Sequence, residues 1–229
     1  MLPIKDNVPT RRFPIVTVAL ILANVAVWLF YELPHLQSSV NELAFHPCEV
    51  NGSCHQIGES WELTAVTSMF MHAGWVHLIG NMLFLWIFGN NVEDAMGRIK
   101  FTLFYFLAGF AATALQTLVT LTTAPHPDTT IPYLGASGAI SGVLGAYFVL
   151  LPWARVLTLL FFFLPFELPA WTFLIIWFGF QLISSSAALE HPQAGGGVAF
   201  FAHVGGFVFG LFTVRWFVSR GRRPLRPAY

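Results

Sequence analysis

Charged residues are scarce in this chain: they occupy 10% of its 229 positions, whereas hydrophobic residues occupy 56%. An ordinary soluble domain carries about 25% charged residues. One buried core could not take up so many large apolar side chains, which include 24 phenylalanines and 8 tryptophans. The scarcity of charge therefore excludes an ordinary soluble domain. The formal net charge of zero gives no indication of nucleic-acid binding.

Long apolar runs recur along the chain, and each is near the length of about 20 residues that crosses a bilayer. Backbone polar groups in lipid must be satisfied within the segment, which favours helices. We predict an all-α polytopic membrane protein with a six-helix bundle in one membrane domain, residues 13–218. A cytoplasmic N-terminus (1–12) precedes it and a basic tail (219–229) follows. The predicted spans are 13–31, 75–95, 99–121, 137–151, 170–187 and 198–218.

Lysine and arginine are missing from three loops, residues 32–71, 122–134 and 189–197, although the chain has eleven of them. Cationic residues collect in cytoplasmic loops. Both termini are therefore predicted in the cytoplasm, and the number of spans must be even. The apolar run Val156–Phe166 is too short to span and is expected to be an interfacial excursion. The first run is expected to be a retained span in the cell (inner) membrane, because no small-residue cleavage site follows Tyr31.

The loop 32–71 mixes polar and apolar residues, which suits short amphipathic helices in the outer interface. It holds the only two cysteines, Cys48 and Cys54. A disulfide between them is the favoured interpretation for an exterior loop. A metal site with His46 and His55 is the less favoured alternative, and we predict no metal and no cofactor.

Small residues line one face of two predicted spans. Ser137, Ser141 and Gly145 recur at every fourth position of the fourth span, and His203 shares a face of the sixth span with two glycines. Small faces let helix axes approach closely. Ser137 is therefore expected within hydrogen-bond reach of His203. The glycines assigned to this packing are Gly138, Gly142, Gly206 and Gly210.

Polar residues lie near the outer ends of the spans that enter from the exterior. His203 is a candidate base for the Ser137 hydroxyl. The oxyanion formed by such chemistry needs preorganised donors, which Asn81, His77 and the Ser137 backbone amide supply. Gly135 would let a substrate backbone approach closely, and His72 lies just before the second span. No carboxylate lies at these ends, so a Ser–His dyad is expected.

Each of these residues, taken singly, also fits a packing role. Closely spaced glycines often only pack helices, and a serine in a span often bonds the carbonyl four residues earlier. That structural interpretation is kept for four polar residues: Ser141, Gln181, Glu93 and Asp94.

Three motifs resemble those of the rhomboid family of intramembrane serine proteases, in its prokaryotic six-span form. They are residues 72–82 (HAGWVHLIGNM), 135–138 (GASG) and 202–206 (AHVGG), with Trp177 and Gln181 as further similarities. The resemblance implies Ser137 as nucleophile, His203 as base and an oxyanion hole at Asn81 and His77. It also implies a gate at the fifth span and the loop at 195–197. One departure is Trp61-Glu62, where many members carry a Trp-Arg pair closer to the first histidine of the signature.

The resemblance implies hydrolysis of peptide bonds in or near the membrane spans of substrate proteins, with lipid as the surroundings. The alternative is a non-proteolytic, rhomboid-like adaptor that binds transmembrane segments. A small channel or transporter lined by His77, Asn81 and His203 is a third, more distant hypothesis. We expect no nucleic-acid partner, and the sequence leaves the oligomeric state open.

Overall fold

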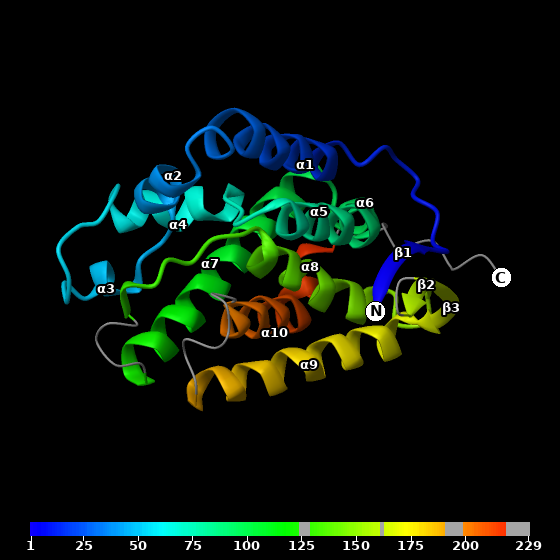
Figure 1. Ribbon diagram of the computed structural model, residues 1–229. Helices are drawn as coiled ribbons and strands as arrows, with labels where there is room; N and C mark the ends of the chain where they lie inside the picture. The colour runs from blue at the N-terminus through cyan, green and yellow to red at the C-terminus, as the bar shows by residue number, and fades with distance from the viewer. Residues whose placement is uncertain (124–128, 161–162, 191–198, 219–229) are drawn as a thin grey trace.

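Helices make up most of the computed structural model, which describes residues 1–123, 129–160, 163–190 and 199–218 (Figure 1). The helices that match the predicted spans are α1 with its extension η1 (Ile15–Val27, Trp28–Glu32), α5 with η3 and α6 (Trp75–Phe84, Leu85–Gly89, Asn90–Met96), α7 (Arg98–Thr123), α8 (Ser137–Leu150), α9 (Ala170–Glu190) and α10 (Phe200–Phe217). The long loop holds α2 (Leu36–Leu43), α3 (Pro47–Val50), α4 (Trp61–Thr67) and η2 (Ser68–Phe70). The expected helical architecture is confirmed.

Length divides these helices into groups. Among the described residues, Ile15–Glu32, Arg98–Thr123 and Phe200–Phe217 are long and apolar enough to cross a membrane. Trp61–Phe70 and Trp75–Met96 pass the same test as a pair, with a bend of 81° between them. Ser137–Leu150 and Ala170–Ser184 are apolar but shorter. The described chain thus has the helices of a multi-pass membrane protein, and the count of six spans stays a prediction.

The short helix α8 lies in the middle of the bundle, against α7 and α10 (Figure 1). Every residue from Gly138 to Tyr147 is buried. At 1.5 Å per residue its 14 residues extend only about 21 Å, less than the hydrocarbon thickness of about 30 Å. A helix enclosed by other helices need not cover that full thickness, because its ends meet protein instead of lipid.

Glycines bring α8 and α10 into backbone contact. A Cβ atom added at Gly206 would collide with the carbonyl oxygen of Gly138, and one at Gly210 with that of Gly142. The four glycines predicted to pack helices therefore lie at one crossing. This crossing fixes where the first turns of α8 and α10 sit relative to each other.

A small sheet corrects the all-α prediction. Strands β1 (Leu2–Asp6), β2 (Arg155–Leu160) and β3 (Leu164–Pro169) pair antiparallel in the order β1-β2-β3. The segment expected to be an interfacial excursion is thus a β-hairpin, and the N-terminal segment is its third strand. In β1 and β2, Leu2 pairs with Leu159, and Val156 pairs with Leu168 across the hairpin. The hairpin alone would be marginal, and the third strand supports it.

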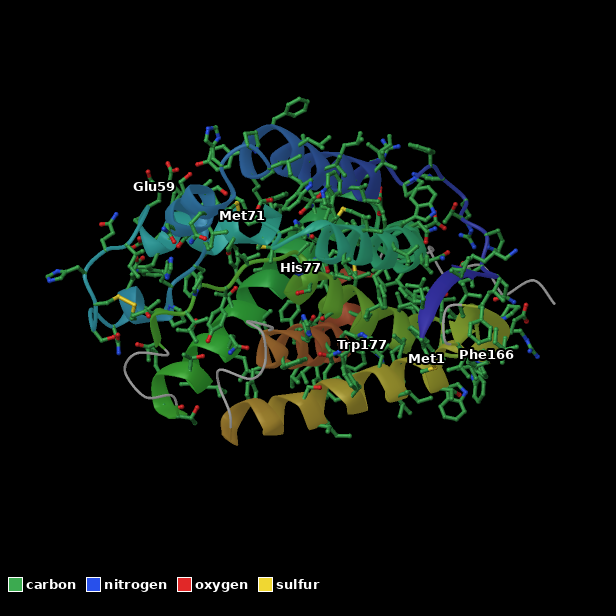
Figure 2. All side chains as sticks on the ribbon, viewed as in Figure 1. Met1, Glu59, Met71, His77, Phe166 and Trp177 are labelled. Atoms are coloured by element: carbon green, nitrogen blue, oxygen red, sulfur yellow. A yellow bond between two sulfur atoms is a disulfide. The ribbon has the colours of Figure 1, made fainter. Side chains whose placement is uncertain are left out.

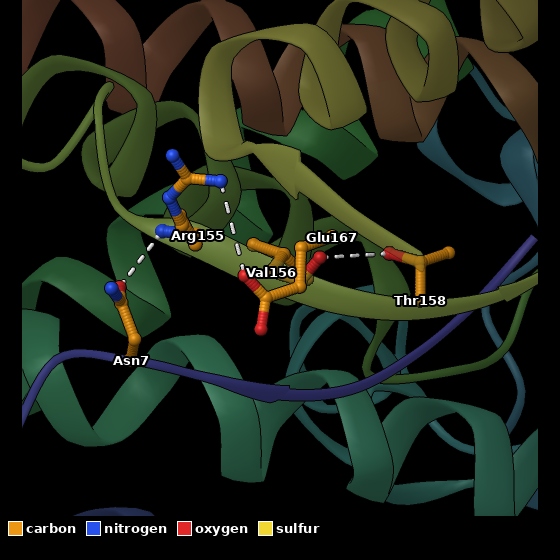
Figure 3. A network of polar contacts seen from close by, with 5 residues as sticks. All are labelled: Asn7, Arg155, Val156, Thr158 and Glu167. Carbon is orange, nitrogen blue, oxygen red and sulfur yellow. Dashed lines mark hydrogen bonds and ion pairs between the residues drawn. The ribbon is translucent and has the colours of Figure 1, made fainter. Parts of the chain in front are cut away.

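Figure 3 shows polar contacts among β2, β3 and the residue after β1, and further polar contacts fasten the sheet to the bundle. The Arg155 amide donates to the Asn7 side chain at 2.8 Å, and its guanidinium lies 3.9 Å from Glu167. The Asp6 carboxylate accepts from the Tyr147 hydroxyl of α8 and from the Asn91 amide of α6. Burial raises the pKa of the Asp6 carboxyl above its usual value. The residues before α1 and those after α8 therefore lie at the same end of the bundle.

Candidate active site

Ser137 and His203 meet at the end of the bundle away from the sheet. Ser137 is the first residue of α8, and His203 lies in the first turn of α10. The Ser137 hydroxyl oxygen is 2.8 Å from the His203 Nε2 atom. The glycine crossing between the two helices produces this approach. The arrangement is the one that a histidine base needs to take a proton from a serine.

The other ring nitrogen of His203 contacts α9. Its Nδ1 atom lies 2.7 Å from the Gln181 side-chain oxygen, and the Trp177 ring packs 6.1 Å from the imidazole between ring centres. In Figure 2 Trp177 is labelled below His77, on the side of α9, and both residues line the groove described below. Gln181 was assigned a structural role from the sequence, and the structure places it directly on the histidine. The signal was its position one turn after Trp177, on the same face of α9.

Hydrogen-bond donors of α5 lie beside the serine. The Ala73 backbone amide donates to His77 Nδ1 at 3.3 Å, so in the neutral ring Nε2 carries the proton. A Cβ added at Gly135 would lie 2.8 Å from that Nε2 and 3.6 Å from the Ser137 oxygen, and Gly135 has φ +125°. The buried Asn81 amide nitrogen has no hydrogen-bond partner among the described residues. Two donors are thus available near Ser137.

His72 lies behind His77 and is fully buried. Its ring meets the His77 ring edge-on at 5.0 Å between centres, and its backbone amide donates to the Glu32 carboxylate at 2.8 Å. Both ring nitrogens of His72 lack a hydrogen-bond partner within the described chain. His72 therefore supports His77 and does not itself reach Ser137. No pattern in the sequence predicted the contact with Glu32, the last residue of η1.

A groove of about 930 Å³ opens onto these residues. Ser137, His203, His77 and Asn81 line it together with Trp177 and Gln181. Helices α5 and α9 form two of its sides, and Phe173 of α9 packs on Phe84 of α5 and Phe88 of η3. The volume is near the upper end of the usual range for ligand pockets. It suits an extended stretch of peptide.

The remaining polar candidates have local partners. The Ser141 hydroxyl donates to the Ser137 carbonyl at 2.6 Å, and the Glu93 carboxylate accepts from the amides of Val16 and Thr17. Asp94 accepts from the Arg11 amide. The described residues include no group of three His, Cys, Asp or Glu side chains that could hold a metal ion. The loop at 195–197 and the tail 219–229 lie outside the described residues.

Comparison with known proteins assigns the family. A Rhomboid domain model matches residues 58–220, which is well over half of the chain. The chain belongs to the rhomboid family. The matched region includes α5, α8, α9 and α10, which supply Ser137, His203 and most of the groove lining, whereas α2, which also lines the groove, lies before it. The resemblance seen in the three sequence motifs is confirmed.

Individual rhomboid proteins show the same likeness over shorter or longer stretches. YdcA of Bacillus subtilis is 32% identical over 139 residues, 60% of this chain and 62% of its own. Rhomboid protein 1, mitochondrial, of Saccharomyces cerevisiae is 30% identical over 69% of this chain and 42% of its own. The Presenilin-associated rhomboid-like protein, mitochondrial, of Bos taurus is 27% identical over 90% and 50%. The chain spans less than two thirds of each relative's length.

Proposed function

We propose that this rhomboid protein is an intramembrane serine endopeptidase that hydrolyses peptide bonds in or near the spans of other membrane proteins. The observation that carries the proposal is the 2.8 Å contact between the Ser137 hydroxyl and His203 Nε2 at the wall of a groove. Rhomboid proteins are generally intramembrane serine proteases, which supports the same reaction for this chain.

The proposed reaction proceeds in two steps. His203 takes the proton of Ser137 while its oxygen attacks the scissile carbonyl, and the protonated ring then returns that proton to the leaving amine. Asn81, His77 and the Ser137 amide face the oxyanion. Water then attacks the acyl-enzyme with His203 again as base, releasing the acid and regenerating Ser137.

The place of the site in the membrane follows from the sheet. We infer that the sheet end is cytoplasmic, because basic residues flank it and none lie in the loops at the opposite end. Ser137 then lies about 20 Å away, toward the exterior of the cell (inner) membrane. A substrate helix hides its carbonyls in hydrogen bonds, so the scissile stretch must unwind first. We expect cleavage near the exterior end of the substrate span, favoured there by Gly, Pro or polar residues.

The test is cleavage of a panel of single-span substrates by the purified protein. Ser137→Ala is expected to reduce cleavage to background while the protein stays folded in detergent. Ser141→Ala is the matched control, because it removes the same hydroxyl one turn along α8, where it bonds a carbonyl and not His203. Cleavage by folded Ser137→Ala protein at the wild-type rate would refute the proposal. Span binding without cleavage by wild-type protein would instead favour an adaptor.

A further inference from the structure

We propose that Gln181 is a positioning residue that holds His203 in the tautomer able to accept the Ser137 proton. The proposal rests on the proposed protease function and adds a residue to the expected dyad. It is carried by one chain of contacts that joins α8, α10 and α9. Ser137 Oγ lies 2.8 Å from His203 Nε2, and His203 Nδ1 lies 2.7 Å from the Gln181 oxygen.

The chemistry of imidazole determines which atom donates and which accepts in these two hydrogen bonds. A neutral histidine carries a proton on one ring nitrogen and a lone pair on the other. The base must present its lone pair to Ser137, so Nδ1 must carry the proton and needs an acceptor. The Gln181 carbonyl oxygen is an acceptor at hydrogen-bond distance, and Gln181 is only 6% exposed. The bond therefore selects the tautomer that leaves Nε2 free.

An amide suits this place better than a carboxylate. A buried carboxylate carries a large desolvation cost unless several donors compensate it, whereas a buried amide carries a much smaller one. The amide dipole still points its negative end at Nδ1 and stabilises the imidazolium that forms during attack. This accounts for a protonatable base in a membrane site without an acidic third member.

The hydrogen bond between Gln181 and His203 joins α10 to α9, one of the helices that line the groove. Gln181 and Trp177 both reach His203 from α9, and α9 also bounds the groove opposite α5. A displacement of α9 that widens the groove would remove the acceptor from Nδ1. The tautomer that leaves Nε2 free therefore depends on the position of α9.

Two substitutions of the full-length protein in lipid vesicles separate positioning from packing. Gln181→Met keeps the side-chain length and removes the acceptor, whereas Gln181→Glu keeps an acceptor oxygen. We expect Gln181→Met to lower kcat about 10- to 100-fold, the effect of losing one hydrogen bond to a charged group, with little change in KM. Gln181→Glu is expected to recover part of that loss, because it keeps the acceptor oxygen but carries the desolvation cost of a buried carboxylate. Equal kcat for wild type and Gln181→Met would overturn the proposal, as would equal losses in both variants.

Gln116→Met is the matched control for the loss of a buried glutamine. Gln116 is 7% exposed and accepts a hydrogen bond from the Ala202 amide, but it does not contact the His203 ring. We expect it to lower the thermal stability at least as much as Gln181→Met does, with a smaller loss of kcat. A loss of kcat as large as that of Gln181→Met would assign the effect to packing and overturn the proposal.

A second readout does not depend on activity. Nitrogen-15 NMR of the His203 ring in vesicles reports which nitrogen carries the proton. We expect Nδ1 to be protonated in wild type and the tautomers to mix in Gln181→Met. A proton on Nε2 in wild type, or an unchanged spectrum in the variant, would overturn the positioning role. Absence of cleavage by wild type would refute the protease function alone.

Discussion

The two ends of the bundle differ in whether their buried polar groups are hydrogen-bonded. At the sheet end, Asp6, Asn91 and Tyr147 are joined in one hydrogen-bonded group that holds β1 against α6 and α8. At the groove end, the Asn81 amide nitrogen and both ring nitrogens of His72 are buried without partners among the described residues. Buried polar groups are normally paired, so unpaired ones need a reason. The contrast fits the proposed function, in which the sheet end anchors the fold and the Asn81 amide at the groove end is free to bind the oxyanion.

The largest expected effect on the cleavage rate comes from removing His203, the proposed general base at the groove end. His203→Ala should lower the cleavage rate at least about 10⁴-fold, because it removes the ring nitrogen that is hydrogen-bonded to the Ser137 hydroxyl. The protein should remain folded in detergent, since His203 is not part of the glycine crossing. Rates of substrate cleavage, with circular dichroism of both proteins, check this. A folded variant with near wild-type activity would remove His203 from the mechanism.

The oxyanion donors should show the next largest effect. Asn81→Ala and His77→Ala are each expected to lower kcat about 10²- to 10³-fold without abolishing turnover. For Asn81→Ala the melting temperature should hardly change, because the amide nitrogen has no partner to lose. Steady-state kinetics and thermal unfolding in the same detergent measure both quantities. Unchanged kcat in both variants would mean that the oxyanion is stabilised elsewhere.

The sheet end should respond in the opposite way. Asp6→Ala leaves the Tyr147 hydroxyl and the Asn91 amide without their acceptor, which should lower the free energy of unfolding by about 1–3 kcal/mol. The cleavage rate below the melting temperature should stay close to wild type. Asp6→Asn, which keeps one acceptor oxygen, is the control and should lose less. A variant that loses activity but no stability would erase the distinction between the two ends.

The smallest effect on cleavage is expected at the disulfide. The structure joins Cys48 to Cys54 beside α3, away from the groove (Figure 2). Both cysteines should be oxidised in protein isolated from intact cells, because their loop faces the exterior in the proposed topology. Mass spectrometry after alkylation without reduction decides this. Two free thiols would contradict the pairing, while replacement of both by serine should leave the cleavage rate unchanged.

The sequence predicted the positions of the long helices well because long apolar runs are strong local signals. It also placed Ser137 and His203 together, since their small-residue faces recur with helical spacing. The sheet could not be predicted from the sequence, because β1 pairs with a strand about 150 residues later. In addition, Pro165 interrupts the pattern expected of a β-strand in the hairpin. The contact of Gln181 with His203 was not predicted, because α9 is almost uniformly apolar and the spacing from Trp177 does not by itself show which face meets α10.

Activation of Ser137 by His203 is tested most directly by the reaction of the wild-type protein with a serine-directed fluorophosphonate, followed by peptide mapping. We expect one adduct, on Ser137. That adduct should be lost in His203→Ala, which removes the base, and retained in Ser141→Ala, which changes the neighbouring hydroxyl. No adduct on wild-type protein, or an adduct on Ser137 that persists in His203→Ala at the same rate, would contradict a histidine-activated serine.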